Sequence, residues 1–121
     1  MTQTQYSQIE VDDTYYERGL RAIRLGEKKI MEDVKIKKLG YELEDSYEPT
    51  VDYCFNLEGV ILLSSNALGQ LRDFNDKYKR DRGKNIKMVN VGPRVRRTLT
   101  VTRLDQTEFD IRNTIEDCLE N

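Results

Sequence analysis

The sequence contains no histidine and no tryptophan, and only two cysteines and two prolines among its 121 residues. Without histidine it lacks the usual general base that activates a serine or cysteine nucleophile, which excludes most familiar hydrolase arrangements. The missing histidine and the absence of paired cysteines also leave no recognisable ligand set, so we expect no metal site and no cofactor. Cys54 and Cys118 both lie among apolar residues, and we expect both to be small buried side chains in a reducing compartment.

Long apolar runs are also missing, and no run approaches the roughly 20 residues that a membrane-spanning helix needs. The first residues show no basic segment followed by an apolar one, so no secretory signal is visible and a cytoplasmic location is expected. With 37% apolar and 35% charged residues, the chain should fold with a highly charged surface. Its length predicts a single domain over residues 1–121, with residues 1–6 disordered.

Catalytic patterns are lacking as well, because no pair of carboxylates stands at a recognisable spacing and no glycine-rich loop could cradle a phosphate. The sequence therefore predicts a protein that is not an enzyme. Positive charge, by contrast, is concentrated: residues 72–103 hold 11 basic and 3 acidic residues. Such a cluster suits an acidic protein, a nucleic acid or an anionic membrane, although a solvated helix face is the simplest interpretation. No aromatic platform or helix-turn-helix pattern accompanies it, so we do not expect nucleic-acid binding.

Apolar periodicity predicts strands alternating with helices, and therefore an α/β domain with a mixed, mostly parallel sheet of about five strands and about four helices. The expected strands cover residues 9–11, 20–25, 51–57, 86–90 and 109–111. The expected helices begin at an Asp33 N-cap and run to about Tyr47, span residues 66–82, and open at Gly92 and Pro93. A last helix should begin with a capping box of Asn113 and Glu116.

The most informative segment is residues 52–69, which read as a buried strand, a polar turn and the start of an amphipathic helix. The turn residues Ser64, Ser65 and Asn66 stand where the helix begins. Small hydrogen-bonding side chains at that position cap the free N–H groups of a helix start, which stabilises a helix by about 1 kcal/mol. The turn should therefore cap the helix and lie at the protein surface, and these two properties are compatible with partner binding.

The run Ser-Ser-Asn-Ala-Leu-Gly at residues 64–69 resembles the Asp-Ser-Ser-Gly-Leu-Gly signature of the STAS domain family, in which anti-sigma factor antagonists occur. Residues 90–97 are similar to the family's Asn-x-x-Pro-x-Val-x-Arg segment, and residues 101–109 to its Leu-Thr-Gly-Leu-Asp…Phe ending. The order of predicted strands and helices is also the one that STAS domains use. The resemblance implies a STAS-like domain over nearly the whole chain.

In anti-sigma factor antagonists the second serine of the signature is phosphorylated by a serine-kinase-like anti-sigma partner, and the added charge breaks the complex. The resemblance thus implies a regulatory protein-interaction module that acts by partner switching in bacterial transcription. The ungapped match places Asn66 at the phosphoacceptor position, and an amide cannot accept a phosphate. An alternative register moves Ser65 to that position but requires an extra residue before Leu68. The residues expected to bind the partner are Ser64, Ser65, Asn66, Ala67, Leu68, Gly69 and Arg72.

A second function is compatible with the same resemblance. Some STAS proteins are cytosolic subunits of ABC-type lipid transporters and dock on the ATPase. The same turn would then face an ABC ATPase in place of an anti-sigma factor. The sequence predicts a protein partner in either case and leaves the choice open.

Overall fold

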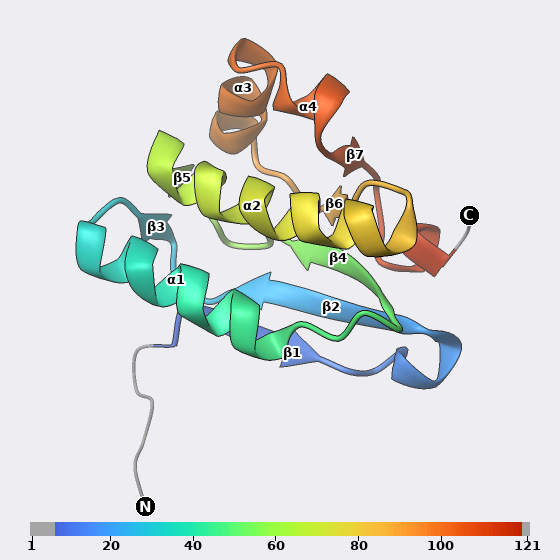
Figure 1. Ribbon diagram of the computed structural model, residues 1–121. Helices are drawn as coiled ribbons and strands as arrows, with labels where there is room; N and C mark the ends of the chain where they lie inside the picture. The colour runs from blue at the N-terminus through green and yellow to red at the C-terminus, as the bar shows by residue number, and fades with distance from the viewer. Residues whose placement is uncertain (1–6, 120–121) are drawn as a thin grey trace, which may run out of the picture.

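The five strands of the main sheet lie in the order β1-β2-β4-β6-β7 (Figure 1). The structure, a computed structural model, describes residues 7–119, so the expected disorder of residues 1–6 falls outside it. The strands are β1 (Ile9–Asp12), β2 (Leu20–Leu25), β4 (Asp52–Asn56), β6 (Lys87–Val89) and β7 (Asp110–Ile111). β1 is antiparallel to β2 and the other pairs are parallel. The predicted α/β fold with a mixed, mostly parallel five-stranded sheet is confirmed.

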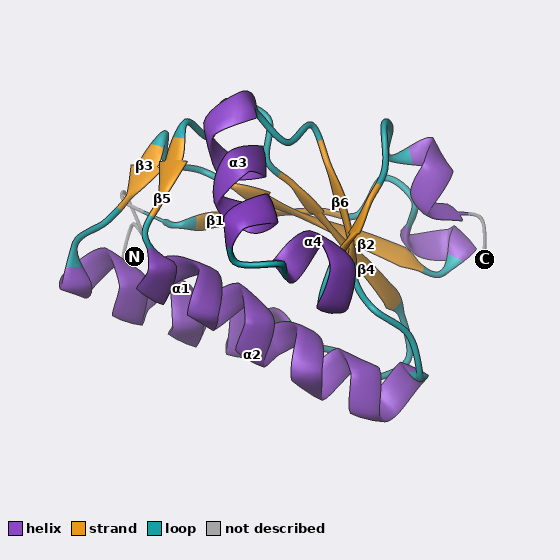
Figure 2. Cartoon of the chain, turned by 90° about the horizontal axis from the view of Figure 1, so that it is seen from above, coloured by secondary structure: helices purple, strands orange, loops and turns teal. Residues whose placement is uncertain are grey.

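The helices are α1 (Asp33–Ser46), α2 (Ser65–Arg82), α3 (Pro93–Val101) and the single turn α4 (Leu104–Thr107). Seen from above, α1 and α2 run side by side along one face of the sheet (Figure 2). The sequence did not predict α4, nor a small parallel pair formed by β3 (Lys29–Ile30) and β5 (Leu62–Leu63). Two 3₁₀ turns, η1 (Tyr16–Arg18) and η2 (Glu116–Leu119), complete the fold. Elements this short leave too weak a periodicity to be recognised in a sequence.

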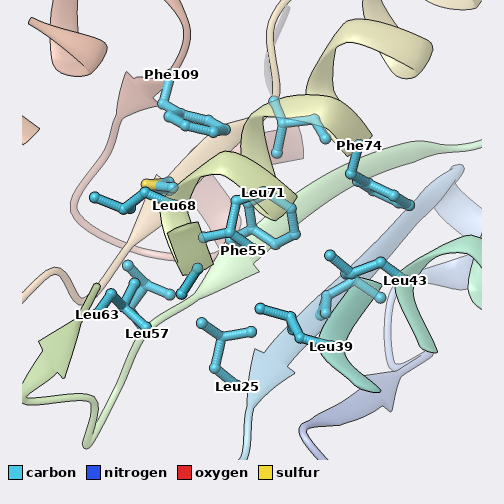
Figure 3. Close-up of a cluster of buried hydrophobic side chains, with 14 of the residues drawn as sticks. Leu25, Leu39, Leu43, Phe55, Leu57, Leu63, Leu68, Leu71, Phe74 and Phe109 are labelled. Atoms are coloured by element: carbon cyan, nitrogen blue, oxygen red, sulfur yellow. The ribbon is translucent and has the colours of Figure 1, made fainter. Parts of the chain in front are cut away.

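The main core lies between the sheet and the helices. Side chains alternate along a strand, so β4 directs Tyr53 and Phe55 toward the helices. Figure 3 shows Phe55 beneath Leu68 and Leu71 of α2, with Phe109 on one side and Leu39 of α1 on the other. These residues are at most 3% exposed. Burying side chains of this size contributes about 1.5–3 kcal/mol each, so this core fixes how α1 and α2 sit on the sheet.

The opposite face of the sheet carries a smaller apolar cluster that includes both cysteines. Cys54 of β4 pairs with Ala22 of β2 and belongs to one cluster with Val89 and with Cys118 of η2. A hydrogen bond with Cys118 and burial together raise the pKa of the Cys54 thiol. Thiolate formation at Cys54 is therefore suppressed, and both cysteines are buried and free, as the sequence predicted.

Two predicted helix starts are wrong by one residue or more. Asp33 is the first residue of α1, and the N-cap is Glu32, which makes no capping hydrogen bond through its side chain. At the C-terminal end the reciprocal cap joins Thr114 and Asp117, not Asn113 and Glu116, with N–H···O distances of 3.1 and 3.2 Å. The element that follows is η2 rather than a full helix. Neighbouring residues with equivalent capping side chains make such positions hard to separate in a sequence.

Asp52, at the start of β4, ties the sheet to the end of α2. Its carboxylate accepts hydrogen bonds from Tyr78 (2.9 Å), Arg82 (3.1 Å) and Lys84 (2.8 Å). Burial alone would raise the pKa of Asp52, but the bonds from Lys84 and Tyr78 outweigh burial and hold the pKa below its ordinary value. A depressed folded-state pKa means that the stabilisation is complete above the ordinary pKa near 4 and is lost as pH falls through the folded value.

Asp52→Asn is expected to lower the unfolding free energy by about 2 kcal/mol at pH 7, because three charge-assisted or buried bonds are weakened. Urea denaturation at pH 7 and again near pH 2 measures the effect, and the difference from the wild type should shrink at the lower pH. The control is Asp76→Asn, since the Asp76 carboxylate has no ion pair or hydrogen bond among residues 7–119. A loss at Asp52 that is independent of pH would contradict this role.

Candidate functional site

The candidate site begins at the turn that connects β5 to α2. Ser64 has extended backbone angles, and its hydroxyl oxygen accepts a hydrogen bond from the Ala67 N–H at 3.1 Å. This bond satisfies one of the free N–H groups at the helix start, so the predicted N-capping role is confirmed for Ser64. The cap fixes Ser65 and Asn66 as the first two residues of α2, and both are exposed.

The residues expected to bind a partner divide into two groups. Ala67 and Leu68 are 0% and 1% exposed and belong to the main core, so they hold the helix in place and offer no surface. Ser65, Asn66 and Arg72 are exposed, and Gly69 is half-buried. Leu68, Leu71 and Phe74 share the buried face of α2, which confirms the helix phase on which the ungapped motif match depends.

A groove of about 720 Å³ lies above the first half of α2. Its floor is formed by residues of the turn and of α2, among them Ser65, Asn66 and Gly69. In Figure 1 this part of α2 lies between α1 below and α3 with α4 above. The walls come from these neighbours, and the residues contributed are Asp33, Val34, Ile36 and Lys37 of α1, and Thr102 and Leu104 near α4. The sequence did not point to the walls, because they come from segments about 30 residues away on either side.

Gly69 gives the groove its depth. A Cβ built at Gly69 has no heavy atom within 4 Å outside its own helix, so the space above it is open. Gly69 is not among the residues with positive φ, so its backbone does not itself require glycine. Glycine inside a helix is destabilising by about 0.5–1 kcal/mol relative to alanine. A helix that retains glycine over an open groove is consistent with a surface kept clear for close approach of another molecule.

An exposed apolar side chain lines the α1 wall of the groove, and another lies next in sequence to the opposite wall. Val34 on α1 is 76% exposed, and Val101, beside the groove-lining Thr102, is 75% exposed. The charged residues that line the groove are balanced, with Asp33 and Asp73 against Lys37 and Arg72. A mixture of exposed aliphatic side chains, hydroxyls and balanced charge is typical of a protein-docking surface more than of a small-molecule catalytic site.

The wall that contains α4 is held by a buried polar network. Asn75 of α2 is 0% exposed, and its side-chain amide donates to the Glu108 carbonyl at 2.8 Å. Its side-chain oxygen accepts the Ile86 N–H at 2.7 Å. One side chain thus joins α2 to the segments that begin β6 and end α4, and it keeps Leu104 beside the groove.

The chain is thus an α/β domain with a mixed five-stranded sheet, with α1 and α2 along one face. A capped turn after β5 leaves the first residues of α2 exposed. A family model of the STAS domain matches residues 27–118, which is most of the chain. The chain therefore belongs to the STAS domain family, as its motifs indicate. No curated protein sequence matches it significantly.

Solved structures show the same fold. An anti-sigma-factor antagonist (STAS) domain protein from Planctomyces limnophilus is 18% identical with a TM-score of 0.74, and the match covers 92% of this chain and 93% of that one. An anti-sigma factor antagonist from Mycobacterium paratuberculosis is 24% identical with a TM-score of 0.68, covering 98% and 96%. The murine Solute Carrier 26 family member A9 anion transporter is 15% identical with a TM-score of 0.63, covering 97% of this chain but 20% of the transporter.

Neither a bilayer-spanning helix nor a cluster of three or more metal-binding side chains occurs within residues 7–119.

Proposed function

We propose that this chain is a regulatory protein-interaction module of the anti-sigma factor antagonist type, acting in the cytoplasm of a bacterium. The turn and groove at residues 64–69 would bind a serine-kinase-like anti-sigma partner, and no catalytic step is assigned to the chain. The observation that carries the proposal is the groove over Gly69, next to the capped turn that matches the family signature. The similarity to antagonists of Planctomyces and Mycobacterium supports this choice of partner class.

The proposed module differs from typical antagonists in its response to phosphorylation. Asn66 is exposed at the second position of α2, where the ungapped motif match places the phosphoacceptor, and it carries no hydroxyl. Ser64 uses its oxygen to cap the helix, which leaves Ser65 as the exposed hydroxyl of the turn. We propose that binding is not switched at the usual position. Stoichiometric phosphate on Ser65 after incubation with the recovered kinase and ATP, with loss of binding, would overturn this part.

Asn66→Asp is expected to weaken partner binding about tenfold, because it adds negative charge to the docking surface and removes an amide donor. The folded state should be unaffected, since a carboxylate in the first turn of a helix is favourable. Calorimetric titration with the recovered partner measures the affinity. Asn113→Asp adds the same charge at an exposed position on the loop before η2 and serves as the matched control. Equal affinities for the wild type and Asn66→Asp would argue that the turn is outside the interface.

The partner class is tested by affinity capture from the source organism's lysate, with captured proteins identified by mass spectrometry. Recovery of a serine-kinase-like anti-sigma factor supports the proposal. Recovery of an ABC ATPase would instead support the alternative function, in which the protein is a cytosolic subunit of an ABC-type lipid transporter. Recovery limited to nucleic-acid-associated proteins that disappear after nuclease treatment would contradict both.

A further inference from the structure

We infer that Cys54 and Cys118 form an oxidation site, at which a peroxide converts the two thiols into a disulfide between β4 and η2. The site belongs to the smaller apolar cluster, on the face of the sheet opposite the helices that form the groove. The inference therefore goes beyond the proposed docking function and does not depend on it. The reacting molecule is a small peroxide, which accepts two electrons from the two sulfur atoms.

The first observation is that the fold brings the two cysteines together from distant parts of the chain. Cys54 is 0% exposed and Cys118 is 5% exposed, and both belong to the same buried cluster. Their side chains share a hydrogen bond. A disulfide joins sulfur atoms about 2 Å apart, so thiols already in hydrogen-bond contact need only a small movement to be joined. The sequence contains no other cysteine, so no third thiol competes for either sulfur.

The second observation is a buried lysine beside this pair. Lys87 of β6 is the register partner of Cys54, so their side chains lie on the same face of the sheet. Lys87 is 9% exposed, and no ion pair or hydrogen bond in the described part of the chain involves its ammonium group. The carboxylate next to it in register, Asp110, pairs with Arg112 at 2.8 Å. A buried cation is costly without a nearby anion, and a thiolate at Cys118 would supply one.

The two thiols differ in how readily they ionise. The hydrogen bond from Cys54, together with the charges of Lys87 and Arg112, holds the pKa of Cys118 below its ordinary value, although burial and Asp117 oppose this. The pKa of Cys54 is raised, so it stays a thiol. Cys118 is therefore the sulfur that attacks the peroxide. It lies on a 3₁₀ turn of only four residues, and so short an element opens locally at low cost to admit a small oxidant.

The reaction has two steps that balance. The Cys118 thiolate attacks one peroxide oxygen, the O–O bond breaks, and the departing hydroxide takes up a proton to become water, which leaves a sulfenic acid on Cys118. The Cys54 sulfur then attacks the Cys118 sulfur, the S–O bond breaks, and the hydroxyl group leaves as water with the proton of the Cys54 thiol. Both thiols are oxidised and the peroxide is reduced to two waters. In a reducing compartment such a disulfide is transient and reports the presence of an oxidant.

The test exposes the folded full chain to hydrogen peroxide and follows it by intact mass and peptide mapping. We expect a mass loss of about 2 Da, reversed by dithiothreitol, and a cross-linked pair of peptides that contain Cys54 and Cys118. The control is the same chain unfolded in urea, which keeps both thiols but loses their contact and the neighbouring charges. Its disulfide should form at least about tenfold more slowly.

Substitutions assign the two steps. Cys54→Ala should accumulate a sulfenic acid at Cys118 that dimedone traps, whereas Cys118→Ala should leave Cys54 reduced. Lys87→Met keeps a long side chain but removes the charge, and should slow oxidation about tenfold. Lys79→Met, at an exposed position on α2, should leave the rate unchanged. A folded wild-type chain that keeps both thiols free, disulfides found only between molecules, equal rates in folded and unfolded chains, or insensitivity to Lys87→Met would each overturn the inference.

Discussion

Gly69→Gln is expected to weaken partner binding at least about 100-fold, which corresponds to about 2.7 kcal/mol. The reason is steric, because the groove floor is open above Gly69 and a glutamine side chain would occupy the space that the partner needs. The fold should tolerate the change, since the added Cβ meets no heavy atom within 4 Å beyond its chain neighbours and the nearby backbone of its own helix. Glutamine also has a higher helix propensity than glycine, so the unfolding free energy should rise slightly.

The matched control is Gly69→Ala, which gains helix propensity but adds one carbon to the groove floor. We expect it to be at least as stable as the wild type and to lose less than about fivefold in affinity. Titration calorimetry against the recovered partner gives the affinities, and urea denaturation gives the stabilities. A Gly69→Gln variant that is folded and binds as tightly as the wild type would show that the partner docks elsewhere.

Asn75→Ala is expected to have the largest effect on stability, a loss of about 3 kcal/mol in unfolding free energy. Asn75 is completely buried, and its removal leaves the Ile86 N–H and the Glu108 carbonyl without their partners at 2.7 and 2.8 Å. Each buried group left unsatisfied costs about 1–3 kcal/mol, and the lost volume adds a small cavity. The variant should also loosen the α4 wall and weaken partner binding.

The control for this variant is Asp76→Ala, one residue along α2, where the carboxylate has no bond within the described residues. It is expected to change the unfolding free energy by less than about 0.5 kcal/mol. Urea denaturation of the three proteins at pH 7 separates the two positions. A loss below about 1 kcal/mol for Asn75→Ala would mean that the network is dispensable, and that water replaces its bonds.

The order of strands and helices could be predicted from the sequence because each long element has its own periodicity and local stop signals. The α2 start is the clearest case, since Ser64, the apolar face of Leu68 and Leu71, and the family motif all agree. The wrong positions, the caps at Asp33 and at Asn113 with Glu116, share a physical cause. Several neighbouring residues can supply the same hydrogen bond, and tertiary packing selects one of them.

The groove was harder to predict because its walls are made by segments remote in sequence. Residues of α1, among them Val34, and Thr102 and Leu104 come together only when these segments pack beside α2. Asn75 could be seen on the apolar face of a helix, but the backbone groups it binds, at Ile86 and Glu108, follow Asn75 by 11 and 33 residues. The sequence motif thus predicts the floor of the groove, whereas the walls become visible only in the folded structure.

The central claim, that a protein partner docks on the α2 turn and its groove, is tested most directly by hydrogen–deuterium exchange of the chain alone and in its complex. The first amides of a helix have no partner within that helix, so they exchange readily until another molecule covers them. The account predicts slower exchange on binding at residues 64–73 and 102–104, with little change in η2. Unchanged exchange at the turn, together with protection on the opposite face of the sheet, would contradict it.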